Sequence, residues 1–135
     1  MYWEAILYLP DREIGLHNFN LAKSPTLQVE ETEAEGVRRW LPLDFLDIDM
    51  RNMLVEERQY FWNYLNKFYF CQSFDKENKD CQITIILRLI DDEYKTIEEW
   101  KLISAYIEKV DFHDFDNSRK IKMTLIFEEA QRVKS

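Results

Sequence analysis

Hydrophobic and polar positions alternate in several short stretches of the chain and recur at helical spacing in one long stretch. Residues 2–9 are aromatic or aliphatic apart from Glu4 and stop at Pro10-Asp11, which predicts an opening strand that ends in a turn. Residues 81–90 are apolar on both alternating faces except at three polar positions, which predicts a central strand. After the turn signal at 116–118, residues 121–127 alternate and predict a last strand.

The stretch 51–70 carries apolar residues at steps of three and four, the spacing of one face of a helix. Asp49 or Asn52 is placed to cap it, because a short side-chain oxygen can accept from the free N–H groups of the first turn. A helix is therefore expected here. Its stripe consists of Leu54, Phe61, Leu65 and Phe68.

The stretch 96–110 fits two patterns. Thr96 and Glu99 have the spacing of a capping box, and apolar residues follow at helical steps, which favours a helix. Strand alternation through Trp100, Leu102 and Ser104 is the alternative. We expect the helix and leave the strand open.

A further strand is expected at residues 26–31 and a strand or extended segment at residues 38–48, while residues 11–23 show no clear pattern. The order of elements predicts an α+β fold, a mainly antiparallel sheet of about four to five strands packed against one or two helices. At 135 residues we expect a single globular domain over residues 1–135.

Composition and charge exclude several classes. The chain has 18 Lys and Arg against 26 Asp and Glu, a net charge of −8, which argues against nucleic acid or an anionic membrane as the main partner. Hydrophobic residues make up 46% of the chain and aromatic residues 15%, which excludes an intrinsically disordered protein.

Cys71 and Cys81 are too few for a disulfide framework and lack metal-site spacing, so both are expected to be reduced core thiols. The first residues have no basic region ahead of an apolar run, unlike a secretory signal. No apolar run is long enough to cross a bilayer. A cytoplasmic protein is therefore expected.

Motifs of catalysis are missing from the sequence. The two glycines, Gly15 and Gly36, lie in no nucleotide-binding fingerprint, and neither His17 nor His113 has a recognisable partner motif. Residues 111–116 combine three aspartates with His113 and could in principle bind a divalent cation. Their spacing matches no known metal loop, so we expect a solvated connection, no metal, no cofactor and no enzyme.

Acidic residues gather in two stretches. Residues 30–49 hold seven acids against two arginines, a net charge of −5, and residues 91–116 hold nine acids against three lysines, a net charge of −6. Such a field can steer a basic protein into contact. Aromatic residues among the acids could anchor it, although Trp40 is equally suited to the core. The expected partner-binding residues are Glu30, Glu31, Glu33, Glu35, Trp40, Asp44, Phe45, Asp47 and Asp49.

The segment Trp40-Leu41-Pro42-Leu43-Asp44-Phe45-Leu46-Asp47-Ile48-Asp49, which leads into the aromatic-rich stretch 51–70, resembles immunity proteins of bacterial polymorphic toxin systems, particularly contact-dependent growth inhibition. The resemblance implies a non-enzymatic inhibitor, a monomer that binds one cognate toxin domain, often a basic nuclease, one to one. Opposite charge would speed association and buried aromatic anchors would slow release.

Two other classes stay open. An acidic secretion chaperone would hold an effector segment by strand addition or in side-chain pockets. A phage anti-defence protein would use carboxylates to imitate DNA phosphates, which requires a continuous acidic stripe. The net charge of +3 over residues 119–135 disfavours that stripe.

Overall fold

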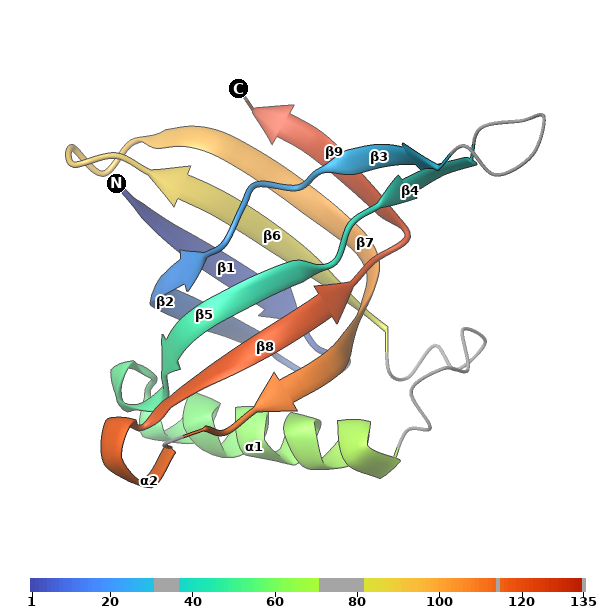
Figure 1. The fold of residues 1–135 in the computed structure, drawn as a ribbon. Helices are drawn as coiled ribbons and strands as arrows, with labels where there is room; N and C mark the ends of the chain where they lie inside the picture. The colour runs from blue at the N-terminus through green and yellow to red at the C-terminus, as the bar shows by residue number, and fades with distance from the viewer. Residues whose placement is uncertain (31–36, 71–81, 114, 135) are drawn as a thin grey trace.

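Six antiparallel strands close into a barrel in the order β6-β1-β2-β5-β8-β7, because β7 also pairs with β6 (Figure 1). The computed structural model describes residues 1–30, 37–70, 82–113 and 115–134. The barrel strands are β1 (Tyr2–Tyr8), β2 (Glu13–Leu21), β5 (Leu43–Asp49), β6 (Ile83–Ile90), β7 (Thr96–Asp111) and β8 (Lys120–Ile126).

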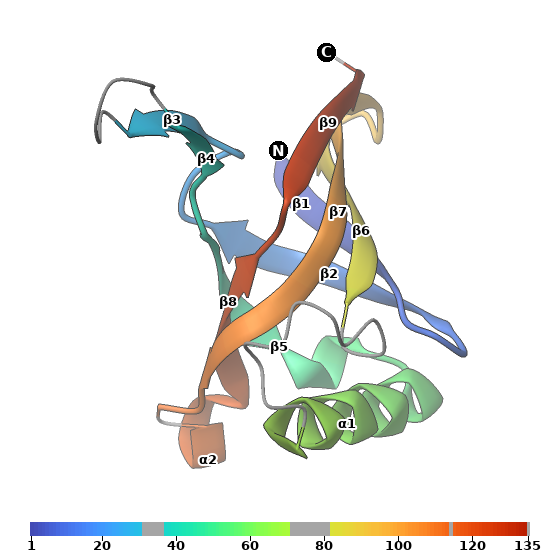
Figure 2. The same cartoon turned by 90° about the vertical axis from the view of Figure 1, so that its right-hand side faces the viewer.

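The long strand β7 joins the two halves of the barrel. One of its edges pairs with β6 and the other pairs first with β9 (Glu129–Lys134) and then with β8. Figure 2 shows β8 and β9 following one another along β7. A separate hairpin, β3 (Leu27–Glu30) and β4 (Val37–Trp40), lies between β2 and β5 in the chain.

Alternate side chains of the barrel strands point inward and fill the interior, as expected for a small barrel. Phe19 and Phe45 stack there with ring centroids 4.8 Å apart. At about 25 cal/mol per Å² of apolar surface, burial of these side chains is the main stabilising contribution to the fold. Fully buried barrel residues include Leu7, Ile14, Leu16, Leu43, Ile85, Leu87, Leu102, Ile107 and Met123.

One end of the barrel is covered by η1 (Met50–Asn52) and α1 (Val55–Phe70) (Figure 1). Phe61, Tyr64 and Leu65 follow the helical spacing and are buried in the same core as the barrel residues. Arg58 of α1 donates hydrogen bonds to the backbone carbonyls of Met50 and Met53, which ties the two elements together. The helix predicted over 51–70 is confirmed, with its α-helical part beginning at residue 55.

The predicted fold class, four to five strands packed against one or two helices, is wrong. The stretch 96–110 forms most of β7, so the expected helix is wrong and the alternation is confirmed. The pattern misled because β7 is bulged. Its register shifts against β6 and again against β8, and inward-facing residues become three apart at each shift, as on a helix.

Most of the other predicted strands are confirmed. The opening strand, the central strand and the last strand are confirmed as β1, β6 and β8. The expected strand 26–31 corresponds to β3, but the one over 38–48 is divided into β4 and β5 at Leu41-Pro42. Cys71 and Cys81 lie outside the described residues. Among the described helices, none has the length and apolar character needed to cross a membrane.

Candidate interaction surfaces

The hairpin of β3 and β4 stands away from the barrel (Figures 1 and 2). We call residues 27–40 the arm. Among the described strands, β3 and β4 pair only with one another, so the outer edge of each lacks a strand partner. Leu27 and Val29 are 45% and 54% exposed. A two-stranded hairpin with exposed apolar side chains and free edges is suited to pairing with another chain.

The base of the arm is held on the barrel by aromatic contacts. The indole of Trp40 lies 6.2 Å from that of Trp100 and 6.0 Å from the ring of Phe127, between centroids. The amide of Leu41 donates to the carbonyl of Thr26, which closes the hairpin at its base. The arm therefore leaves the barrel from a fixed point.

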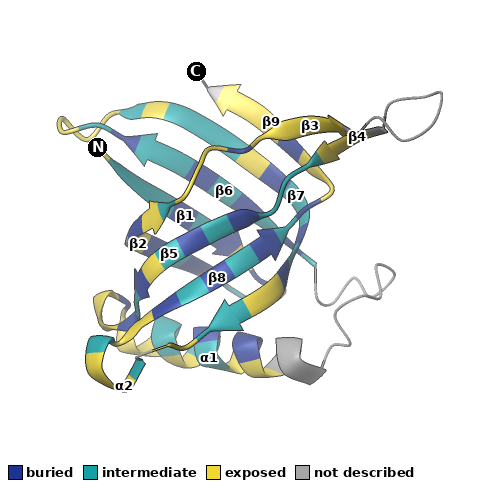
Figure 3. Ribbon diagram, in the orientation of Figure 1, coloured by how far each residue is buried: buried dark blue, intermediate teal, exposed yellow. Residues whose placement is uncertain are grey.

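Many exposed residues lie toward the two ends of the barrel (Figure 3), and several of the exposed residues are large and hydrophobic. At the end that carries the arm, Tyr94 of the β6–β7 turn and Val133 of β9 add to the arm's own residues. At the opposite end, Leu54 and Val55 begin α1, and Phe112 precedes α2 (Phe115–Ser118). Both ends of the barrel therefore carry large apolar side chains in contact with solvent.

A second surface feature at the α1 and α2 end is a cavity of about 270 Å³. We call it the arginine pocket, and it is lined by Met50, Arg51, Arg58, Trp62, Phe115 and Arg119. The guanidinium of Arg119 lies 5.6 Å from the centroid of the Phe115 ring. Among the described residues, one carboxylate lies in an ion pair with this group of three arginines, that of Asp49, which pairs with Arg51. The pocket therefore carries an excess of positive charge on an acidic protein.

Asp49 neutralises only Arg51. Its carboxylate accepts from Nη2 of Arg51 at 2.7 Å and from the Arg51 amide at 2.9 Å, so it also caps η1. The hydrogen bond from the Arg51 side chain lowers the pKa of Asp49. The same contact raises the pKa of Arg51.

A ladder of charges crosses the outer wall of the barrel. Arg88 of β6 lies between Glu4 of β1 and Glu99 of β7, and all three side chains are partly buried. Nη1 of Arg88 is 3.6 Å from Glu4, and Nε of Arg88 donates to Glu99. His17 of β2 extends the row, with Nδ1 3.4 Å from Glu4. These contacts join four neighbouring strands and hold the wall together.

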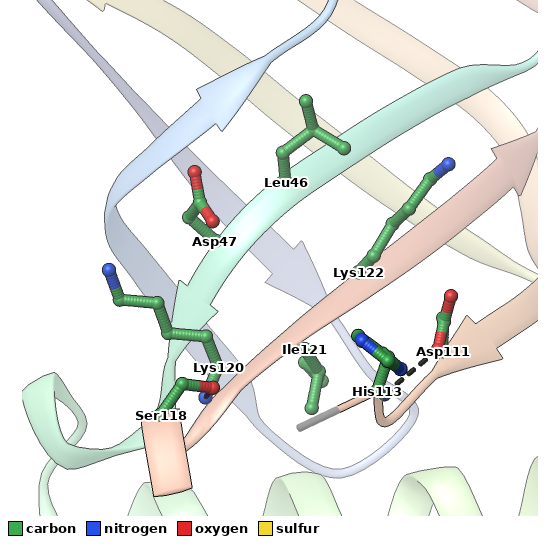
Figure 4. A pocket seen from close by; sticks show the side chains of 8 residues that line it. All are labelled: Leu46, Asp47, Asp111, His113, Ser118, Lys120, Ile121 and Lys122. Carbon is green, nitrogen blue, oxygen red and sulfur yellow. Dashed lines mark hydrogen bonds between the residues drawn. The ribbon is translucent and has the colours of Figure 1, made fainter. Parts of the chain in front are cut away.

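Another cavity of about 380 Å³ lies beside β5 and β8 (Figure 4). Its lining mixes Asp47 and Asp111 with Lys120 and Lys122, so the charges nearly balance. The amide of His113 donates to Asp111 Oδ1 at 2.9 Å, a bond within the loop itself. Within the described parts of the chain, no group of three His, Cys, Asp or Glu could hold a metal ion, and Asp114 lies outside them. The pocket shows no chemistry beyond a polar surface.

The residues expected to bind a partner are only partly described, and those that the structure describes differ in their surroundings. Glu31, Glu33 and Glu35 lie outside the described residues, as does the side chain of Glu30. Trp40 is on the barrel rim, and Phe45 is fully buried inside the barrel. Their role in binding a partner stays a prediction.

The three predicted aspartates lie on β5, and each has a bonding partner. Asp44 accepts from the hydroxyl of Thr124 at 2.6 Å, and Asp47 accepts from Nδ2 of Asn20 at 2.7 Å. Asp49 is held by Arg51 as described above. These contacts give all three a local structural role.

Sequence reasoning missed the exposed apolar pair on the arm and the arginine pocket. A signal for the first was present, because Leu27 and Val29 flank Gln28 in strand alternation. For the arginine pocket the sequence offered a partial signal, because Arg58 and Trp62 are four residues apart and so share a face of the predicted helix. Arg51 and Arg119 reach the same pocket only through the fold.

The sequence matches no known protein family and no curated protein. Solved structures do resemble it. Hcp1 from E. coli pathovar EAEC 042, a double mutant, matches with a TM-score of 0.65 at 13% identity, covering 100% of this chain and 92% of that one. A chain of the anti-feeding prophage baseplate, symmetrised six-fold, matches with a TM-score of 0.59 at 10% identity, covering 98% and 92%. Hcp1 from Flavobacterium johnsoniae matches with a TM-score of 0.54 at 14% identity, covering 97% and 95%.

These matches overturn the resemblance to immunity proteins. The predictions of an immunity protein and of a monomer that binds a toxin one to one are wrong, because the structural neighbours are Hcp1 and a phage-like baseplate. The chaperone and anti-defence alternatives differ from them as well. The chain has the fold seen in Hcp1 and in the anti-feeding prophage baseplate over nearly its whole length.

Proposed function

We propose that this chain is a non-enzymatic, ring-forming subunit of a type VI secretion tube or of a phage-like baseplate. The observation that carries the proposal is the arm, which leaves Leu27, Val29 and the outer edges of two strands exposed. An isolated hairpin of this size is marginally stable in water. A second copy of the chain that packs on the arm would cover both its apolar side chains and its edges.

The fold supports the same function. The match to the baseplate chain covers nearly all of both chains, and that assembly is symmetrised six-fold. A closed ring uses the same contact between every pair of neighbours, so one arm and one receiving surface per chain are enough to build it. The proposed role is structural, and the ring is its functional unit.

The experiment is a measurement of mass in solution by native mass spectrometry and light scattering. We expect the wild type to form a closed oligomer of several 16.5 kDa chains. The double variant Leu27→Glu/Val29→Glu should run as a single chain with an unchanged far-UV spectrum, because both side chains are exposed and lie outside the barrel. A wild type that stays monomeric at every concentration would refute the proposal.

A matched control uses the same two positions. Leu27→Val/Val29→Ile keeps the surface apolar, so the oligomer should survive it. If this conservative variant dissociates like the glutamate variant, the apolar surface of the arm does not carry the contact between neighbouring chains.

A further inference from the structure

Three arginines from separate parts of the chain converge on the arginine pocket. Arg51 belongs to η1, Arg58 belongs to α1, and Arg119 lies between α2 and β8. The fold brings them together around a cavity of about 270 Å³, on a chain whose net charge is −8. Like charges around one cavity repel each other, and an anion that enters the cavity would relieve that repulsion.

Two of these arginines are held by neutral groups. Arg58 donates from Nε to the carbonyl of Met50 at 3.0 Å and from Nη2 to the carbonyl of Met53 at 3.3 Å. Arg119 packs its guanidinium over the ring of Phe115. Carbonyl groups and aromatic rings orient a guanidinium but do not cancel its charge. Both arginines are therefore held in place as cations.

The third arginine is offset by a carboxylate. Within the described parts of the chain, Asp49 is in an ion pair with Arg51, so three guanidinium groups and one carboxylate leave the pocket with a net charge of +2. A phosphate group carries a charge of about −1.5 to −2 at pH 7. The N–H donors of arginine also match its oxygens in geometry. A phosphate group therefore fits the charge of the pocket better than a single carboxylate does.

The backbone at Arg119 is shaped to deliver this side chain. Arg119 follows α2 with a φ of 58°, a conformation that helix ends usually give to glycine. Its amide donates to the carbonyl of Phe115 at 2.8 Å, and its carbonyl accepts from the amide of Met50 at 3.4 Å. Glycine would form the same turn with less strain but would bring no guanidinium to the pocket. Strained residues of this kind cluster at ligand-binding sites.

Aromatic side chains form an apolar side of the pocket. Trp62 stacks on Phe112, with centroids 5.7 Å apart, and meets Phe115 edge to face at 5.8 Å. Trp62 and Phe115 both line the cavity. Apolar rings beside a few convergent polar groups are typical of pockets that bind small molecules. An organic group attached to a phosphate would lie against these rings.

We propose that the arginine pocket binds a phosphate group, either free or carried by a small organic molecule. This site is separate from the contact between chains proposed above, because α1 and α2 lie at the end of the barrel opposite the arm (Figures 1 and 2). A bound phosphate would join η1, α1 and the turn before β8, so it should also stabilise the folded chain.

Titration calorimetry with inorganic phosphate at constant ionic strength tests this site. We expect one phosphate to bind per chain, and the melting temperature should rise when phosphate replaces chloride. Arg119→Gln, at an exposed side chain, should weaken binding at least about tenfold. Lys101→Gln, on the exposed barrel wall, is the matched control and should bind as the wild type does. A wild type that binds no phosphate, or that binds it no better than Arg119→Gln, would overturn the inference.

Asp49→Asn gives a test in the opposite direction. The substitution removes the carboxylate paired with Arg51 and raises the net charge of the pocket to +3. It should tighten phosphate binding at least about threefold. This gain cannot come from damage to the fold, so it also covers the case in which Arg119→Gln fails to fold. Unchanged or weaker binding would contradict a site set by these charges.

Phenyl phosphate and benzoate identify the kind of ligand. Tighter binding of phenyl phosphate than of inorganic phosphate would support an organic carrier that contacts Trp62 and Phe115, and equal binding would support free phosphate. Benzoate has the same ring and one negative charge, so it should bind at least about tenfold more weakly than phenyl phosphate. Equal binding of the two would overturn the assignment to phosphate.

The arm variant separates this inference from the proposed function. Leu27→Glu/Val29→Glu changes the opposite end of the barrel, so it should bind phosphate as tightly as the wild type. If the wild type forms no rings but binds phosphate, the proposed function fails and the phosphate site stands. If rings form and no phosphate binds, the phosphate site fails alone.

Discussion

The indole of Trp40 meets the indole of Trp100 edge to face, with their planes at 76°. Trp40 ends β4 and Trp100 lies in β7, so this contact joins the base of the arm to the barrel wall. The guanidinium of Arg132 lies over the Trp100 ring, 5.6 Å from its centroid. The direction of the arm, and with it the proposed assembly, depends on this group of side chains.

Replacing Trp40 by Ala should therefore affect both stability and assembly. We expect the free energy of unfolding to fall by about 2–4 kcal/mol, because a partly buried indole is removed from two aromatic contacts. The oligomer should also dissociate at concentrations where the wild type is assembled. Urea denaturation and light scattering measure the two effects, and Trp40→Phe, which keeps a ring, should show less of both.

Phe45→Ala should destabilise the barrel and leave the exposed side chains unchanged. Phe45 is fully buried and stacked on Phe19, so its truncation should cost about 3–5 kcal/mol in urea denaturation. Tyr94→Ala, at a side chain that is 83% exposed, is the comparison and should change the free energy of unfolding by no more than about 0.5 kcal/mol. A small loss at Phe45 would contradict the packing described for the barrel interior.

Arg88→Met should weaken the barrel wall. The substitution leaves the carboxylates of Glu4 and Glu99 partly buried and without their shared cation, which should cost about 1–3 kcal/mol. Lys95→Met breaks a surface pair with Glu93, in which both side chains are mostly exposed, and should cost less than about 1 kcal/mol. Equal losses in the two variants would mean that the ladder is no stronger than a surface pair.

Asp49→Asn should change how stability depends on pH. The pKa of Asp49 is lowered in the folded state, so its charge stabilises the fold above its unfolded pKa of about 3.9. That contribution is lost as the pH falls through the lower folded pKa. The wild type should be more stable than Asp49→Asn at neutral pH, and the difference should shrink below about pH 4. The asparagine can still cap η1, so the charge is the main change.

Glu108→Gln, at an exposed position of β7, is the control for the loss of one carboxylate. Its free energy of unfolding at neutral pH should lie within about 0.5 kcal/mol of that of the wild type. A difference between wild type and Asp49→Asn that stays constant down to about pH 2 would contradict a lowered pKa at Asp49.

The sequence pattern predicted the regular elements well and the bulged ones poorly. In α1 the buried Phe61, Tyr64 and Leu65 follow helical spacing, and β6 alternates from Ile83 to Leu87, so burial in these parts follows from spacing alone. In β5, Phe45 and Ile48 both face inward although they are three apart, because the strand is bulged and Asp47 has a φ of 56°. β7 is irregular around Ser104, which has a φ of 53°, and its register with β6 shifts there. This shift gave the apolar residues of the strand the spacing of a helix.

β2 was missed for the same reason. Ile14 and Leu16 keep alternation, but Phe19 breaks it, since the register with β1 shifts between Trp3 and Glu4. The pairing of β6 with β7, which closes the barrel, has register shifts as well, and no local pattern reveals them. The sequence predicted the acidic residues as a binding face, whereas the three aspartates of β5 are each bonded locally, and Glu31, Glu33 and Glu35 lie outside the described residues.

The most direct test of the central claim is electron microscopy of the purified wild-type protein, with class averages compared between wild type and Leu27→Glu/Val29→Glu. The account predicts closed rings for the wild type, with six-fold symmetry as in the baseplate that shares the fold, and single small particles for the variant. Class averages that show only single particles for the wild type, at concentrations well above those of the solution measurements, would contradict it.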